Sequence, residues 1–113
     1  MSSLARKAEQ ASIAKRILVF RGQRVLLDTD LAELYRVSPK RLNEQVRRNR
    51  ARFPPEFLIQ IEIKELHNLR SQIATLRGGW GRHRKYPPLA FTEHGAVMAA
   101  TVLNSPRAVE MSV

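Results

Sequence analysis

The chain has 113 residues, of which 43% are hydrophobic, and this combination suits one compact folded domain and excludes a wholly disordered tail. It contains no cysteine, which excludes disulfides and thiolate metal sites, and its apolar runs are far shorter than the roughly 20 residues of a membrane span. Twenty lysines and arginines against ten acidic residues give a net charge of +10, which indicates a polyanionic partner: DNA, ribosomal RNA or an anionic membrane surface.

Residues 1–16 are predicted to be a basic N-terminal arm or leader. The segment lacks the apolar core of a secretory signal. A basic arm can reach into a minor groove, whereas a solvated leader has no binding role, and the sequence leaves both interpretations open. Its cations are Arg6, Lys7, Lys15 and Arg16.

A β-hairpin is predicted over residues 17–21 and 24–27, two β-branched and apolar runs. Gly22-Gln23 is the expected two-residue link between its strands. The side chains expected to form its buried face are Ile17, Val19, Val25 and Leu27.

Residues 30–35 predict a short helix, because apolar side chains recur at the i, i+3, i+4 spacing of one buried stripe. Asp30 and Glu33 have the spacing of a capping box at its start. The stripe consists of Leu31, Leu34 and Tyr35.

A second helix is predicted over residues 39–50. Ser38 supplies an N-cap and Pro39 a first-turn proline, which together are a strong helix start signal. Leu42 and Val46 lie four residues apart on its inner face, and Phe53 continues that stripe. The opposite face then carries Lys40, Arg41, Glu44, Arg47 and Arg48.

The spacing of Ala32, Val37 and Leu42 resembles a helix-turn-helix, in which the second helix is offered to the DNA major groove. Arg36 departs from that pattern, because glycine is usual there and another residue pays roughly 1 kcal/mol for a positive φ. We therefore expect a turn of different shape. A solvated amphipathic helix is the alternative to a recognition helix.

After Pro54-Pro55, residues 57–61 predict a short strand and residues 62–76 a helix. His67 is expected on the surface of that helix. The side chains spaced for burial are Leu66, Leu69, Ile73 and Leu76.

Residues 77–88 contain three glycines, two prolines and four cations, and predict an exposed basic loop. Trp80 stands among the cations and can stack on a base or enter a minor groove. Alternatively, Trp80 folds back onto the core as a lid.

Residues 89–91 predict a short strand, and Thr92 with Glu93 predicts the start of a helix that runs to Leu103. Ala96, Ala99 and Ala100 give this helix a small-residue surface for close packing. Asn104 is expected to end it, and Ser105-Pro106 to begin another helix.

Taken together, residues 17–113 predict a single α+β domain. A small sheet, made of the hairpin and short strands, packs with a helix-turn-helix-like pair and further helices.

An ordered series of residues along this domain resembles the KilA-N group of phage and bacterial DNA-binding domains, within it the branch named "ORF-six N-terminal". The resemblance implies a DNA-binding domain whose last helix continues beyond the point where this chain stops, so that helix is expected to be cut short. The series is Asp28, Asp30-Leu31-Ala32, Leu34-Tyr35, Val37, Lys40, Leu42-Asn43, Val46, Arg48-Asn49, Arg52-Phe53-Pro54, Phe57, the segment LAFTEHG at 89–95, and Val97-Met98.

We therefore predict sequence-directed binding of double-stranded DNA by a phage or prophage-type transcriptional regulator. The second helix would enter the major groove, and the basic loop would contact the backbone or the minor groove. Candidates for base edges are Arg41, Asn43, Glu44, Arg47 and Arg48. Candidates for the backbone are Lys40, Arg50, Arg52, Arg77, Arg82, Arg84 and Lys85, with Trp80 in the loop.

The alternative is an antirepressor-type module that binds a phage or host regulatory protein, since KilA-N-type domains also occur in antirepressors. A homodimer is expected on general grounds, because one small helix-turn-helix rarely gives sufficient affinity. We expect a cytoplasmic, nucleoid-associated protein without cofactor, metal or catalysis. The residues that metal-dependent cleavage would need are too scattered in the sequence, namely Asp28, Asp30, Glu33, His83, Glu93 and His94.

Overall fold

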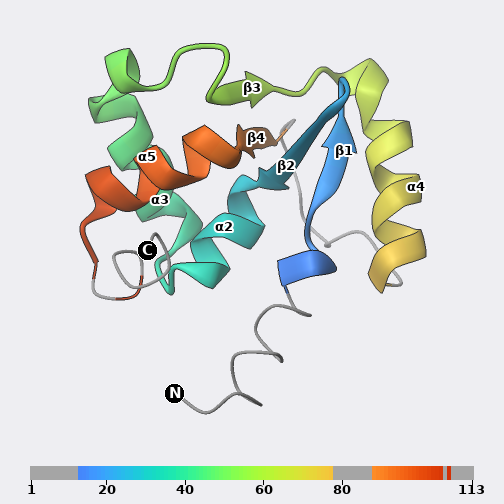
Figure 1. The fold of residues 1–113 in the computed structure, drawn as a ribbon, viewed down its shortest axis with the longest axis horizontal. Helices are drawn as coiled ribbons and strands as arrows, with labels where there is room; N and C mark the ends of the chain where they lie inside the picture. The colour runs from blue at the N-terminus through green and yellow to red at the C-terminus, as the bar shows by residue number, and fades with distance from the viewer. Residues whose placement is uncertain (1–12, 78–87, 106, 108–113) are drawn as a thin grey trace.

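The computed structural model describes residues 13–77, 88–105 and 107, and within them the α+β prediction is confirmed. Four antiparallel strands form one sheet in the order β1-β2-β4-β3 (Figure 1). The strands are β1 (Leu18–Phe20), β2 (Gln23–Leu27), β3 (Leu58–Gln60) and β4 (Leu89–Thr92).

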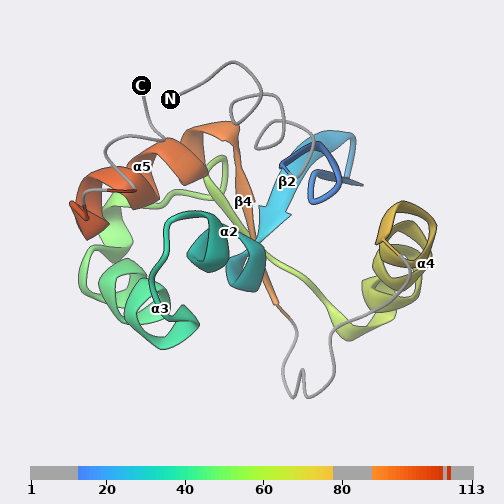
Figure 2. The same ribbon diagram turned by 90° about the horizontal axis from the view of Figure 1, so that it is seen from below.

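Helices cover both faces of this sheet. Figure 2 shows α2, α3 and α5 on one side and α4 on the other. The α-helices are α2 (Asp28–Leu34), α3 (Pro39–Arg48), α4 (Leu66–Arg77) and α5 (Glu93–Leu103), and the short 3₁₀ helices are η1 (Arg50–Arg52) and η2 (Ile63–Glu65).

The sheet separates two hydrophobic clusters, because successive side chains of a strand point to opposite faces. Phe91 belongs to the cluster beneath α2, α3 and α5, whereas its neighbour Ala90 belongs to the cluster beneath α4. Leu42 and Val46 of α3 pack into the first cluster, and Leu69 and Ile73 of α4 into the second.

The hairpin forms as predicted, but its turn lies one residue earlier. Arg21 and Gly22 form the link with φ of 51° and 75°, and Phe20 pairs with Gln23. This register buries Leu18 and leaves Val19 57% exposed, so the predicted inner face of the first strand is wrong. A shift by one residue moves every side chain of a strand to the other face.

The first helix of the central pair begins earlier than predicted, at Asp28. Its N-cap is Leu27, which makes no side-chain cap, so the predicted capping box of Asp30 and Glu33 is wrong. Asp30 lies instead within the first turn, buried and 3.6 Å from the guanidinium of Arg16.

The second helix begins as predicted. The hydroxyl of Ser38 accepts a hydrogen bond of 3.0 Å from the backbone N–H of Arg41, and Pro39 is the first helical residue. The helix ends at Arg48 rather than at residue 50, because Asn49 leaves the helical conformation and donates its side-chain amide to the carbonyl of Gln45. Arg50–Arg52 then forms η1.

The segment predicted as one helix over residues 62–76 is divided into η2 and α4. Glu62 and Glu65 form a capping box at the start of η2. Leu69 and Ile73 are buried as predicted, but Leu76 is 40% exposed, so its predicted burial is wrong. Leu76 lies in the last turn of α4, where it lines an open groove beside the edge strand β1 rather than the core.

The β4 to α5 connection is confirmed. The hydroxyl of Thr92 accepts a hydrogen bond of 3.3 Å from the N–H of Gly95, and Asn104 ends α5 with a φ of 47°. A Cβ at position 95 would overlap the carbonyl oxygen of Phe57, so only glycine fits where α5 passes the turn before β3. The helix predicted to begin at Ser105-Pro106 lies mostly outside the described residues.

Candidate nucleic-acid interface

Helix α3 presents a cationic face to solvent, because its inner face is fixed in the core. Leu42 and Val46 are 0% and 1% exposed, and the side chains on the opposite side of a helix must then point outward. Lys40, Arg47 and Arg48 are exposed on that outer side.

Two neighbouring helices hold α3 in place. Both α2 and α5 pack against it (Figures 1 and 2). The guanidinium of Arg41 donates a hydrogen bond of 3.3 Å to the carbonyl of Leu103, at the end of α5. Arg41 was predicted to contact a base edge, which stays a prediction, and in this structure its side chain joins α3 to α5.

The arginines continue from α3 into η1. Arg50 and Arg52 are exposed there, directly after Arg47 and Arg48. Phe53 fixes the end of η1 in the core, with its ring 6.2 Å from that of Phe91 in an edge-to-face arrangement. The structure therefore exposes four arginines within six residues, from the last turn of α3 through η1.

The cations of this interface make no ion pair within the described part of the chain. The ion pairs that the structure contains involve Arg16 with Asp30 and Glu33, Arg21 with Glu65, and Lys64 with Glu62. The cations without such a partner are Lys40, Arg47, Arg48, Arg50 and Arg52.

The ion pairs shift the pKa values of their members. Hydrogen bonding to Glu33 raises the pKa of Arg16, and hydrogen bonding to Glu65 raises the pKa of Arg21. The bond from Arg21 in turn lowers the pKa of Glu65. These pairs stabilise segments outside α3 and leave the charge of its outer face uncompensated.

Two polar candidates on α3 are less open to solvent. Asn43 and Glu44 are half-buried, and the side-chain oxygen of Asn43 is buried without a hydrogen-bond partner among the described residues. An asparagine that reads adenine must present both its amide oxygen and its nitrogen, so Asn43 would have to turn outward first.

Most of the basic loop predicted over residues 77–88 lies outside the described residues. Trp80, Arg82, Arg84 and Lys85 lie outside the described residues. Arg77 is the last residue of α4, and Figures 1 and 2 place α4 on the opposite side of the sheet from α3. The described structure thus does not bring Arg77 together with the α3 face.

One exposed arginine beside this face was not predicted as a contact residue. Arg36 lies in the turn between α2 and α3 with a φ of 55°, so the predicted change of turn shape is wrong. The turn between α2 and α3 keeps the left-handed conformation that is usual for glycine, although arginine occupies the position. The helix-turn-helix spacing was the sequence signal that could have identified it.

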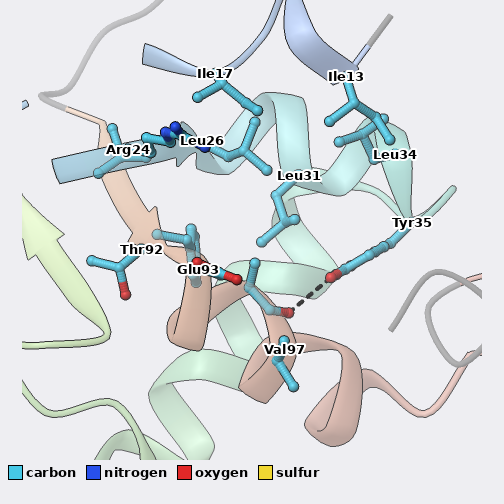
Figure 3. A pocket seen from close by; sticks show the side chains of 13 residues that line it. Ile13, Ile17, Arg24, Leu26, Leu31, Leu34, Tyr35, Thr92, Glu93 and Val97 are labelled. Atoms are coloured by element: carbon cyan, nitrogen blue, oxygen red, sulfur yellow. Dashed lines mark hydrogen bonds between the residues drawn. The ribbon is translucent and has the colours of Figure 1, made fainter. Parts of the chain in front are cut away.

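An apolar hollow of about 370 Å³ lies between β2, α2 and α5 (Figure 3). Leu26, Leu34 and Val97 line it, and Val97 is 49% exposed. The hydroxyl of Tyr35 also faces the hollow but donates a hydrogen bond of 2.8 Å to the carbonyl of Ala96, as the dashed line in Figure 3 shows. Burial raises the pKa of Tyr35 to about 12.

The acidic and histidine side chains of the described residues do not converge on a metal site. No group of three or more His, Cys, Asp or Glu side chains within residues 13–77, 88–105 and 107 has the geometry to hold an ion. Asp30 and Glu33 face Arg16, and His94 stacks on Phe57 with ring centroids 5.8 Å apart. His83 lies outside the described residues.

No helix in the described part of the chain is long and apolar enough to cross a membrane.

A family model, the ORF6N domain, matches residues 15–102. The match covers more than half of the chain and includes every strand and helix described above except the last residue of α5, Leu103. No curated protein and no solved structure matches the chain.

Proposed function

This chain belongs to the ORF6N domain family of phage-type regulatory domains, and from that premise we propose that it binds double-stranded DNA. In this proposal α3 enters the major groove. Lys40 at its start and the arginines of η1 then follow the phosphate backbone.

One observation carries the proposal: the cations of α3 and η1 are exposed and have no carboxylate partner among the described residues, whereas Arg16, Arg21 and Lys64 are paired. Concentrated positive charge costs stability through self-repulsion unless a polyanion compensates it. A phosphate backbone supplies that compensation and releases counterions on binding.

The residues divide into two roles by position. Arg47 and Arg48 lie on the outer face of α3, where a guanidinium can pair bidentately with guanine. Lys40, Arg50 and Arg52 lie at the two ends of this surface and are suited to phosphates, which fix the register of a helix in the groove.

Binding of a mixed-sequence duplex, titrated from low to physiological salt, tests the proposal against single-stranded RNA. If Lys40, Arg50 and Arg52 contact phosphates, the logarithm of the affinity should fall with the logarithm of the salt concentration, and these three contacts should give a slope of about −3. Tighter binding of the duplex than of RNA supports the proposal. Absence of duplex binding at low salt overturns it.

A second candidate function has a separate observation in its favour. The apolar hollow and the exposed side chain of Val97 form a surface that suits a protein partner, as an antirepressor would require. This function predicts binding of a phage or host regulator that survives high salt and is lost in Val97→Asp. DNA binding, by contrast, should be unchanged by Val97→Asp and lost at high salt.

A homodimer would place two α3 helices in successive major grooves, about 34 Å apart along the DNA. Light scattering of the free chain and of its complex with a two-site duplex tests this arrangement.

A further inference from the structure

Arg36 occupies a backbone conformation that arginine rarely adopts. It follows the last turn of α2 with a φ of 55°. The N–H of Arg36 donates to the carbonyl of Glu33 at 3.1 Å, and the N–H of Val37 donates to that of Ala32 at 3.0 Å. These two bonds form a Schellman motif, and its left-handed residue is most often glycine.

The conformation has a cost that another residue would avoid. For a side chain with a Cβ, the left-handed region costs roughly 1 to 2 kcal/mol. Asn104 ends α5 in the same region, and asparagine tolerates that conformation better than arginine does.

Arg21 provides an internal comparison, since it is also an arginine with a positive φ. Its guanidinium makes two hydrogen bonds to the carboxylate of Glu65, at 2.9 and 3.1 Å, and lies 4.9 Å from the ring centre of Phe20. The side chain of Arg21 thus contributes contacts to the fold that offset the cost of its backbone.

Arg36 has no equivalent contact. Its side chain is exposed, and no hydrogen bond, ion pair or ring contact joins it to another described residue. The left-handed conformation of Arg36 therefore destabilises the fold, and its side chain makes no contact with another described residue that would offset this cost. Strained residues of this kind cluster at functional sites, where the side chain acts on a ligand.

We propose that Arg36 binds a phosphate of the DNA duplex and so sets the position of α3 in the groove. This inference rests on the proposed function and adds a contact to it. The guanidinium is suited to the task because it offers two parallel N–H donors to phosphate oxygens. Arg36 stands two residues before Ser38, the N-cap of the proposed recognition helix.

The test uses the full chain and two readouts, the thermal midpoint and the salt dependence of duplex binding. Arg36→Gly relieves the backbone and removes the cation, and Arg36→Asn does the same with a residue that tolerates a positive φ. We expect both variants to unfold at or above the wild-type midpoint. We also expect them to bind duplex roughly tenfold more weakly at 0.1 M salt, with a salt slope shallower by about one.

Two variants serve as controls. Arg36→Lys keeps the charge and should keep most of the wild-type salt slope. Arg21→Gly relieves the same backbone strain in the hairpin but removes the contacts to Glu65 and Phe20. It should leave the salt slope unchanged and give no rise in midpoint.

The outcomes separate this inference from the proposed function. If wild type binds duplex and Arg36→Gly keeps the same affinity and slope, Arg36 holds no phosphate. If Arg36→Gly and Arg36→Asn both unfold well below the wild-type midpoint, the left-handed conformation of Arg36 does not destabilise the fold, and the premise of the inference is wrong. If wild type itself binds no duplex at low salt, the proposed function fails and this contact fails with it.

Discussion

The hydroxyl of Tyr35 donates a 2.8 Å hydrogen bond to the carbonyl of Ala96, so the end of α2 is joined to the first half of α5. The two residues are 61 positions apart in the sequence. Helix α3 packs against both of these helices. The position of the proposed DNA-binding helix therefore depends on how α2 and α5 are held together.

Replacing Tyr35 by Phe should lower the free energy of unfolding by about 1 kcal/mol at neutral pH, since a typical hydrogen bond contributes that amount. Urea denaturation measures the change. DNA binding should persist, because the ring remains in the core.

The same residue predicts a pH dependence. Tyr35 has its pKa raised from 10.0 to about 12, so the folded chain keeps a proton that the unfolded chain releases. The stability from this group is complete below pH 10 and is lost as the pH rises towards 12, by about 2 kcal/mol. Tyr35→Phe should lack this loss, and parallel stability curves for the two proteins above pH 10 would contradict the assignment.

Leu42→Ala should destabilise the chain by roughly 2 to 5 kcal/mol, because Leu42 is fully buried on the inner face of α3. Leu76→Ala is the matched control, since Leu76 is 40% exposed, and should change the stability by less than about 1 kcal/mol. Chemical denaturation of both variants gives the comparison. Equal effects would mean that α3 is turned differently from the structure.

Gly95→Ala should also destabilise the chain, by about 1 to 3 kcal/mol, because the new Cβ would overlap the carbonyl of Phe57 and the backbone must move. In an exposed helix the same substitution normally stabilises by about 1 kcal/mol, so the sign of the change is decisive. Ala74→Gly in the exposed face of α4 measures that ordinary helix effect in this chain.

Local signals in the sequence were sufficient for much of the fold. Ser38-Pro39 predicted the start of α3, and Thr92 predicted the start of α5, because a cap is formed by residues that are neighbours in the chain. The inner face of α3 followed from the spacing of Leu42 and Val46.

Features that depend on register or on distant contacts were not predicted. The buried face of β1 was wrong because the turn at Arg21 and Gly22 is one residue earlier than expected, and no local pattern distinguished the two registers. The contact of Arg41 with Leu103 joins residues 62 positions apart, and only the packing of α3 on α5 creates it.

The candidate site was predicted in part. The sequence pattern placed Arg47 and Arg48 on the exposed side of α3, and the structure confirms their exposure. The pattern could not show that these arginines lack partners while Arg16 and Arg21 have them, because ion pairs depend on tertiary positions.

The central claim is that DNA binds through the outer face of α3, and the duplex affinity of two double variants tests it most directly. Arg47→Ala with Arg48→Ala removes two cations from that face, whereas Lys64→Ala with Arg70→Ala removes two exposed cations from η2 and α4, across the sheet. With folding confirmed by circular dichroism, we predict that the first pair weakens duplex binding at least about tenfold and that the second changes it little. Equal losses of duplex affinity in the two double variants, or wild-type affinity in the variant with Arg47→Ala and Arg48→Ala, would contradict the claim.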